Sequence, residues 1–207
     1  MLVMFSGIVQ EIGIIEKLEY KNNILEISVL SKTPLKDLKL GDSIAIDGCC
    51  QTVTETNNNS FKVQATQETI EKTNFKFLQK GSKINLEPSL KLGDNIGGHF
   101  VTGHIDTTGK VSDINTFGEN KIVKIIFPSE LSDFIASKGS VTVNGVSLTV
   151  IELKNCEFSF TLIPFTRDNT NLGFIKINDP VNLEIDIVSR YLVNYLRNNK
   201  ETVRGRI

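Results

Sequence analysis

Apolar and polar residues alternate over many short stretches of the chain, which is the pattern of strands with one buried face. The clearest stretch is 24–30, where Leu25, Ile27 and Val29 alternate with polar residues. Glycine, asparagine and aspartate separate the stretches, and many short strands punctuated in this way are typical of a β-barrel or sandwich. Strands are predicted at 4–15 (bent), 24–30, 43–46, 50–55, 60–65 and 83–87, and again at 102–111, 121–127, 141–143, 147–152, 158–163 and 181–187.

The second half of the chain repeats the first at a constant spacing. Thr52 corresponds to Thr149, 97 positions later (149 − 52 = 97), and the same spacing joins the Asn-Leu-Glu triplets at 85–87 and 182–184. The opening strands correspond at a spacing of 96 (103 − 7 = 96), as their glycines indicate. Because so long a period is that of whole domains, we predict domains at 1–97 and 98–187, followed by a tail at 188–207.

Helix is predicted only in short connections and at the end of the chain. A helical turn is expected at 35–40, and Ser129 is a candidate N-cap for a helix at 129–137. Apolar residues at 188, 191, 192, 195 and 196 have helical spacing, so 188–198 is predicted as a helix with a frayed end beyond it. Neither barrel offers this apolar stripe a partner, and a second subunit is expected to cover it.

Six strands in each copy favour a closed barrel, because closure removes exposed strand edges. The predicted fold class is therefore all-β, with two tandem homologous six-stranded barrels and a C-terminal α-helix.

Composition narrows the classes of function. A net charge of −1 without a basic stripe argues against nucleic acid as a partner. No apolar run approaches the roughly 20 residues of a membrane helix, and the start of the chain does not predict a signal peptide. The three cysteines are expected to be reduced thiols in a cytoplasm. His99 and His104 are five positions apart (104 − 99 = 5), which places them on opposite faces of a strand, so no metal site is predicted.

Several motifs, in order from Met4 to about Leu196, resemble the riboflavin synthase family. They are MFSGIV at 4–9, DGCC at 47–50, GGHFVTGH at 97–104, NGVSLTV at 144–150 and the two Asn-Leu-Glu triplets. The resemblance implies Greek-key barrels and a homotrimer assembled by the C-terminal helix. It also implies a transferase that acts on two molecules of 6,7-dimethyl-8-ribityllumazine. One donates four carbons to the other, giving riboflavin and 5-amino-6-(D-ribitylamino)uracil, with no metal or redox cofactor.

A duplicated binding fold suits such a reaction, because two identical substrates need two similar pockets held face to face. In the family the facing pockets come from different subunits. Association with lumazine synthase, the preceding enzyme of the pathway, is left open.

Two positions break the repeat in a way that fits a donor site differing from an acceptor site. His104 stands where the first copy has Ile8, and Asp186 stands where it has Ser89. Histidine is the residue type suited to proton transfer near neutral pH, which makes His104 a candidate, and the resemblance places Asp186 where it polarises Ser147 or a water molecule. The alternatives are a hydrogen-bonded structural histidine for His104 and a solvated strand end or helix cap for Asp186.

Cys50 corresponds to Ser147, and each lies two residues before one of the paired threonines, Thr52 and Thr149. We predict that Cys50 and Thr52 contact one lumazine and that Ser147 and Thr149 contact the other, whereas Cys49 points into the core. The alternative for Cys50 is a small buried apolar residue. The candidate catalytic residues are therefore His104, Ser147, Asp186, Cys50 and Thr149.

The resemblance extends both pockets to neighbouring loops, which in the family bind the ring and the ribityl hydroxyls largely through backbone groups. Lys138 is similar to a substrate-contacting lysine of the family, with a solubilising surface lysine as the alternative. Asp47, Gln51 and Phe165 depart from the residues common in the family. The predicted substrate-binding residues are Gly7, Ile8, Val9, Ser43, Cys50, Gln51, Thr52, Gln64, Ala65, Thr66, Gln67, Glu68, Thr69, Gly103, His104, Ile105, Lys138, Ser147, Leu148, Thr149, Ile163, Pro164, Phe165, Thr166, Arg167 and Asp168.

The main alternative is a binding protein. Lumazine-binding fluorophore proteins share the double barrel and hold one lumazine or flavin without turnover, with the histidine-bearing segment and the Ser-Leu-Thr triplet altered. Both are intact in this sequence, at 97–104 and 147–149, which favours the enzyme. A flavin reductase-like barrel would need a nicotinamide domain, for which the chain has no room and no G-x-G-x-x-G motif.

Overall fold

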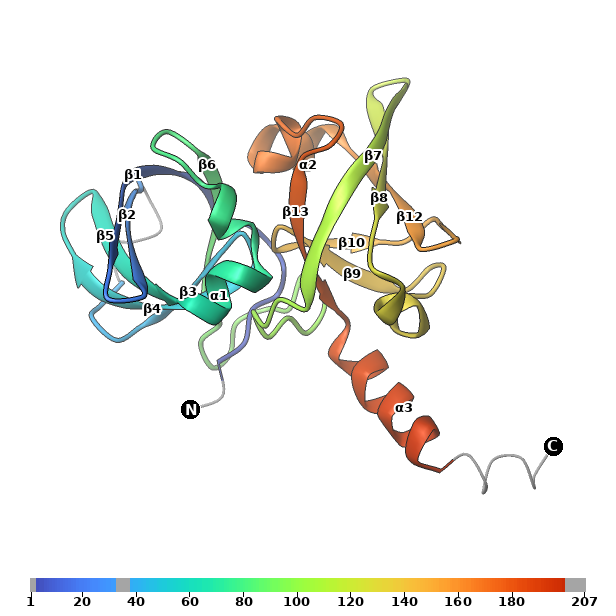
Figure 1. Cartoon of the computed structure of the whole chain (residues 1–207). Coiled ribbons are helices and arrows are strands. Elements are labelled where there is room, and N and C mark those ends of the chain that lie inside the picture. The colour runs from blue at the N-terminus through green and yellow to red at the C-terminus, as the bar shows by residue number, and fades with distance from the viewer. Residues whose placement is uncertain (1–2, 33–37, 200–207) are drawn as a thin grey trace.

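The computed structural model describes residues 3–32 and 38–199, and it contains two β-structures side by side with one helix extending from the second (Figure 1). The first is a closed antiparallel barrel with the strand order β1-β2-β5-β4-β3-β6, as predicted. Its strands are β1 (Glu11–Lys21), β2 (Ile24–Leu30), β3 (Ser43–Ile46), β4 (Cys49–Thr56), β5 (Ser60–Thr66) and β6 (Lys83–Pro88), and its helices are α1 (Gln67–Lys72) and the 3-10 helix η2 (Asn74–Phe77).

Side chains of the first barrel alternate between core and outer face. On β4, Cys49, Gln51 and Val53 are buried, whereas Cys50 and Thr52 lie on the outer face and are more accessible. The buried set packs with apolar residues of the other strands into one continuous core. The alternation that predicted the strands therefore also decides which side chains can face a ligand outside the barrel.

The second copy forms a curled seven-stranded sheet, in the order β10-β9-β13-β7-β8-β12-β11. The predicted single strand at 147–152 is divided, because Val150 donates to the carbonyl of Gly139 on one side and Ile151 donates to that of Ser159 on the other. Its two halves thus form the two edges of the sheet. The strands are β7 (Thr107–Phe117), β8 (Asn120–Ile126), β9 (Ser140–Val143), β10 (Val146–Thr149), β11 (Glu152–Lys154), β12 (Glu157–Leu162) and β13 (Pro180–Ile185).

The hairpins before β4 and β10 meet between the two halves. Asp47 (φ 46°) and Gly48 (φ 78°) form a two-residue turn with left-handed backbone, and so do Asn144 (φ 47°) and Gly145 (φ 76°). A Cβ on Gly48 would lie 2.7 Å from the Cα of Gly145. Glycine is therefore required at this contact for two reasons, the left-handed backbone of the turn and the close approach of the two backbones.

The short helices α2 (Pro164–Asn169) and η4 (Asn171–Gly173) repeat α1 and η2. The predicted helix at 129–137 is the 3-10 helix η3 (Ser129–Phe134), and the predicted cap is wrong, because the N-cap is Pro128 and no side chain caps the helix there. Of the predicted turn at 35–40 and the frayed tail, residues 35–37 and 200–207 lie outside the described ranges.

The opening strands begin later than predicted, β1 at Glu11 and β7 at Thr107, and both continue beyond their predicted ends. The residues before them form two straps, the first at 5–10 and the second at 101–106. The straps meet where Phe5 and Val101 exchange main-chain hydrogen bonds of 2.8 and 3.1 Å. Each strap then crosses to the other copy. Val9 packs on the core of the second sheet, and Ile105 packs on the core of the first barrel.

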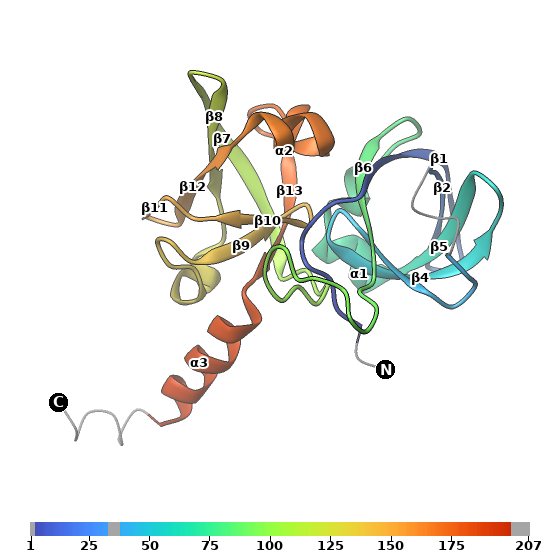
Figure 2. The same cartoon turned by 180° about the vertical axis from the view of Figure 1, so that it is seen from behind.

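Helix α3 (Ile187–Asn198) points away from both β-structures, as the front and back views agree (Figures 1 and 2). Its base is tied to the second strap by an ion pair of 2.7 Å between Arg190 and Asp106. Further along, Arg197 lies 2.6 Å from Asp133 of η3. No helix in the described part of the chain has the length and apolar character needed to cross a membrane.

Candidate active sites

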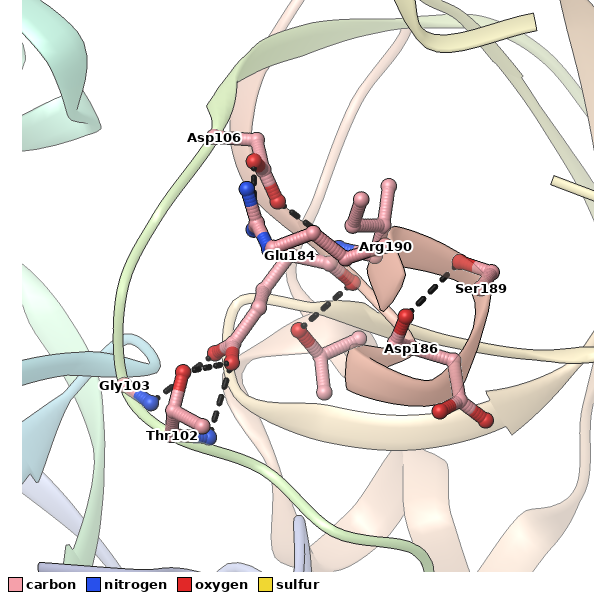
Figure 3. Close-up of polar contacts among 9 residues, drawn as sticks. Thr102, Gly103, Asp106, Glu184, Asp186, Ser189 and Arg190 are labelled. Carbon is pink, nitrogen blue, oxygen red and sulfur yellow. Dashed lines mark hydrogen bonds and ion pairs between the residues drawn. The ribbon is translucent and has the colours of Figure 1, made fainter. Parts of the chain in front are cut away.

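A buried glutamate fixes each strap. On β6, the carboxylate of Glu87 accepts from the main-chain N–H (2.7 Å) and hydroxyl (2.8 Å) of Ser6 and from the N–H of Gly7 (3.1 Å). On β13, Glu184 likewise accepts from the N–H (2.8 Å) and hydroxyl (2.6 Å) of Thr102 and from the N–H of Gly103 (3.0 Å) (Figure 3).

Burial raises the pKa of both glutamates, and the strap hydrogen bonds oppose that rise. The Asn-Leu-Glu triplets that revealed the repeat thus provide the anchors of the two straps.

One glycine in each strap joins that strap to the outer face of the opposite copy. The carbonyl of Gly103 accepts from the N–H of Cys50 (2.9 Å), and that of Gly7 accepts from the N–H of Ser147 (2.8 Å). Both glycines have left-handed backbone, with φ of 78° and 75°. A Cβ on either one would come within 2.6 Å of the Cβ of its partner. The first copy therefore carries the strap of the second, and the second carries the strap of the first.

This exchange assembles two corresponding clusters from the predicted residues. In the first site, Cys50 and its neighbours Ser43 and Thr52 on the outer face of the first barrel meet the second strap at Gly103, and the strap continues into His104 and Ile105. The second site combines Ser147 and Thr149 of β10 with Gly7, Ile8 and Val9 of the first strap. Sequence spacing predicted these residues as members of two sites, but it did not predict that the straps are exchanged.

Within the first site, Ser43 and Thr52 are paired across β3 and β4, and Cys50 is half-buried beside them. Burial raises the pKa of the Cys50 thiol, and a hydrogen bond with Ser43 opposes the rise. Cys49 faces the core as predicted, and burial raises its pKa to about 12, so it stays a thiol. All three cysteines of the chain are free thiols.

Some predicted residues turn their side chains away from these clusters. Gln51 is buried in the first barrel, where its amide donates to the carbonyl of Cys50 (2.6 Å). Ala65 and Leu148 are core residues as well. Only the backbone of these three residues can reach a ligand on the outer face. Lys138 is exposed with left-handed backbone (φ 66°), and its N–H donates to Val150.

The predicted pocket loops contain the starts of α1 and α2. Gln64 and Thr66 lie on the accessible face of β5, and Thr66 caps α1 by accepting from the N–H of Thr69 (3.3 Å). In α1, Glu68 pairs with Lys72, and Gln67 is hydrogen-bonded to the hydroxyl of Tyr20. The second loop has Pro164 at its first helical turn instead of a side-chain cap. It spans Ile163, Pro164, Phe165, Thr166, Arg167 and Asp168, with Arg167 paired to Asp168 and Phe165 exposed.

His104 and Ile8 occupy corresponding places on the two straps and line different cavities. His104 is exposed and lines a cavity of about 400 Å³ with Lys72 of α1 and with Arg190 and Tyr191 of α3. Ile8 lines a cavity of about 500 Å³ that also includes Ser43 and the loop at 88–97. The histidine is therefore accessible to a bound molecule, which fits a role in proton transfer better than a structural role in the core.

Asp186 lies at the start of α3, where its carboxylate accepts from the N–H of Val188 (2.9 Å) and caps the helix. The cap considered as an alternative is thus present. Ser147 instead has its side-chain contact with His99, whose Nδ1 is 2.8 Å from Oγ of Ser147. Asp186 acts on this histidine through its charge, which raises the pKa of His99 against the lowering caused by burial.

Sequence reasoning considered His99 only as a metal ligand and missed this contact. The signal available was its place in the GGHFVTGH motif, one residue beyond the glycine that lies against Ser147. Among the described residues, no cluster of three or more histidine, cysteine, aspartate or glutamate side chains has a geometry for a metal.

Comparisons with known proteins agree with this architecture. The family model of the lumazine binding domain matches the chain twice, over residues 6–89 and 102–186. The riboflavin synthase of Actinobacillus pleuropneumoniae is 37% identical over 93% of this chain and 90% of its own length. That of Bacillus subtilis is 35% identical over 96% of this chain and 92% of its own length.

Among solved structures, LumP complexed with 6,7-dimethyl-8-(1'-D-ribityl) lumazine superposes with a TM-score of 0.80 at 27% identity, covering 88% of this chain and 99% of LumP. LumP complexed with riboflavin has a TM-score of 0.82 at 28% identity, with the same coverage. The sequence resemblance is confirmed by these matches. The chain belongs to the riboflavin synthase family and is built from two lumazine-binding domains.

Proposed function

We propose that the chain catalyses the last step of riboflavin biosynthesis. Two molecules of 6,7-dimethyl-8-ribityllumazine react, one giving up a four-carbon unit, to form riboflavin and 5-amino-6-(D-ribitylamino)uracil. The observation that carries the proposal is the pair of corresponding sites, each built from the outer face of one copy and the strap of the other. Two equal sites suit two equal substrates, and holding both rings in place supplies much of the rate through proximity and orientation.

The proposed roles follow the asymmetry between the sites. His104 of the first site exchanges a proton with the acidic 7-methyl group of one lumazine. In the second site, Ser147 acts as the nucleophile at C7 of the other, with Thr149 holding the ring and Asp186 supplying negative charge. Cys50, with Thr52 and Ser43, contacts the ring in the first site. The remaining predicted pocket residues bind the ribityl chain and ring edges, largely through their backbone.

We further propose a homotrimer in which the first barrel of one subunit faces the second sheet of the next. Support comes from α3, whose Tyr191 and Leu192 are 72% and 56% exposed although the helix is amphipathic. An apolar stripe of this kind is stable in water only when another surface covers it.

The domain limits 1–97, 98–187 and 188–207 belong to the same proposal, as does a cytoplasmic location consistent with free thiols. Association with lumazine synthase stays an open prediction.

The test is to incubate the purified protein with 6,7-dimethyl-8-ribityllumazine alone and follow absorbance and fluorescence. We expect riboflavin and the pyrimidine product in equal amounts, at half the rate of lumazine consumption. The second candidate function is a fluorophore-binding protein, which the similarity to the two LumP complexes favours. Tight binding of lumazine without any riboflavin formation would select that candidate and overturn the enzyme.

A further inference from the structure

The second site contains a side-chain pair that backbone contacts hold in place. Nδ1 of His99 lies 2.8 Å from Oγ of Ser147, and the N–H of His99 donates to the carbonyl of Ser6 (3.1 Å). Gly98 makes this approach feasible. A Cβ at that position would be 2.2 Å from the carbonyl oxygen of Ser6 and 2.7 Å from the Cβ of Ser147. The close approach at Gly98 and the main-chain hydrogen bond of His99 thus place the imidazole beside the hydroxyl.

The pair belongs to the second copy alone. Ninety-six positions before His99 stands Val3 (99 − 96 = 3), the spacing that relates the two straps. Val3 packs against the same small apolar cluster as Cys50, the residue that corresponds to Ser147. The first copy therefore has an aliphatic side chain at the position from which the second copy places an imidazole on a hydroxyl. This difference accompanies the change from Ser89 to Asp186, whose charge acts on the same imidazole.

The surroundings of His99 favour a neutral ring. Burial lowers the pKa of His99 below its ordinary value, and Asp186 opposes this only in part. A neutral imidazole has one nitrogen that can accept a hydrogen bond, and the hydroxyl of Ser147 is the group in contact with Nδ1. Nε2 is buried and has no hydrogen-bond partner among the described residues. A ring that is neutral at rest can take up a proton during a reaction.

We propose that His99 is a positioning residue for the reaction proposed above, acting through Ser147. It orients the hydroxyl and accepts its proton at Nδ1 as Oγ bonds to C7 of the lumazine. In that step the Oγ–H bond breaks, the Oγ–C7 bond forms, and the π pair of the double bond at C7 moves into the conjugated ring. When the serine leaves C7, the imidazolium returns the proton to Oγ. The inference rests on the proposed function, and it places the group that activates the serine nucleophile in the second copy.

The decisive variant is His99→Asn, whose side chain can place a polar atom near Nδ1 but cannot take up a proton. We expect kcat to fall by about 100-fold, the lower range for a lost proton acceptor, with KM changed by less than about twofold. In the Ser147→Ala background the same substitution should have no further effect, because the two residues act as one unit. An equal loss in both backgrounds, or full turnover by His99→Asn, would overturn the inference.

Two more measurements separate this role from a structural one. The wild-type kcat/KM should show a fall that lies below the ordinary histidine pKa of 6.5, and His99→Asn should lose this fall while any fall caused by His104, the other proton-transfer group, is kept. Val3→Asn is the matched control in the first copy, and turnover as low as that of His99→Asn would show that packing is the cause. If the wild type makes riboflavin and the variant matches it, only this inference fails. If the wild type makes none, the proposed function fails first.

Discussion

Asp47 and Asn171 are joined across the two copies by a hydrogen bond of 2.8 Å from the Asn171 amide to the Asp47 carboxylate. Asp47 is buried and also accepts from the N–H of Asn85 (2.7 Å) and the amide of Asn74 (2.8 Å). The corresponding position in the second copy is Asn144, a neutral residue. One carboxylate thus sits in a network otherwise made of amides at the contact between the two copies.

This carboxylate should make stability depend on pH. Burial raises the pKa of Asp47 to about 6 from 3.8, and three hydrogen bonds only partly oppose the rise. The folded chain therefore binds this proton more tightly than the unfolded chain. The resulting stability is complete below pH 3.8 and is lost as the pH rises through about 6. The difference of about 2 pKa units corresponds to about 3 kcal/mol of unfolding free energy.

The first prediction concerns Asp47→Asn, which copies the residue of the second half. The unfolding free energy of the variant minus that of the wild type should increase by about 2 kcal/mol between pH 4 and pH 7, which is most of the full difference. Urea unfolding at one protein concentration measures it. Asp94→Asn, at an exposed loop carboxylate that accepts from Lys91, is the control. A difference for Asp47→Asn that does not change with pH would contradict the prediction.

The second prediction tests the contact between strap and barrel with two glycines of similar backbone. Gly103 (φ 78°) has Cys50 against it, whereas Gly81 (φ 88°) has nothing within 4 Å of an added Cβ. Gly81→Ala should cost about 1–2 kcal/mol for the left-handed backbone alone. Gly103→Ala should cost a further 1–3 kcal/mol, roughly, through overpacking, and should weaken lumazine binding because Cys50 is displaced. Urea unfolding and a fluorescence titration give the two values. Equal effects of the two variants would show that the strap can shift to accommodate the added methyl group without a cost in stability or binding.

Much of the fold could be predicted because its determinants are local. Alternation along β2 and the Asp-Gly and Asn-Gly turns act within a few residues, so they are visible in the sequence. The exchange of straps is different. Glu87 binds Ser6 at a separation of 81 residues, and a repeat shows which residues correspond without showing which copy each strap covers.

The same difference between local and long-range determinants applies to the candidate sites. Cys50 and Ser147 could be predicted as corresponding residues because the repeat aligns them, and their neighbours on β4 and β10 follow from strand alternation. The contact between His99 and Ser147 spans 48 residues in the sequence. It depends on Gly7 and Gly98, which let both backbone segments approach Ser147 closely. The glycine before His99 indicates a close approach, but no local pattern identifies Ser147 as the partner. The division of the strand at 147–152 also depends on neighbours from elsewhere in the chain.

The third prediction separates the two roles of Asp186, the helix cap and the negative charge. Asparagine caps a helix about as well as aspartate, whereas alanine removes a cap worth about 1 kcal/mol. Asp186→Asn should therefore unfold like the wild type yet lose at least about tenfold in kcat, since the charge acting on His99 is gone. Asp186→Ala should lose both stability and turnover. Steady-state kinetics beside thermal unfolding measures the two effects. If Asp186→Asn keeps full turnover, the residue serves α3 alone.

The fourth prediction concerns His104, the accessible histidine of the first site. His104→Ala should reduce turnover by at least about 100-fold, as expected when a proton-transfer group is lost, and should leave the unfolding midpoint unchanged because the side chain is exposed. Lumazine binding, measured by fluorescence, should change little. Full turnover by this variant would remove His104 from the proposed mechanism and leave proton transfer at the 7-methyl group to another residue.

The last prediction concerns α3 and the sharing of sites between subunits. Replacing Leu192 and Tyr195, which lie on its exposed apolar stripe, with lysine places two charges where a neighbouring subunit is proposed to pack. We expect light scattering to report the mass of a single chain in place of a trimer. Riboflavin formation should be nearly abolished, while lumazine still binds, because each site lies within one chain and only their pairing is lost. Asn194→Lys, outside the stripe, should leave trimer and turnover intact. A monomeric double variant with normal turnover would show that both lumazines react within one chain.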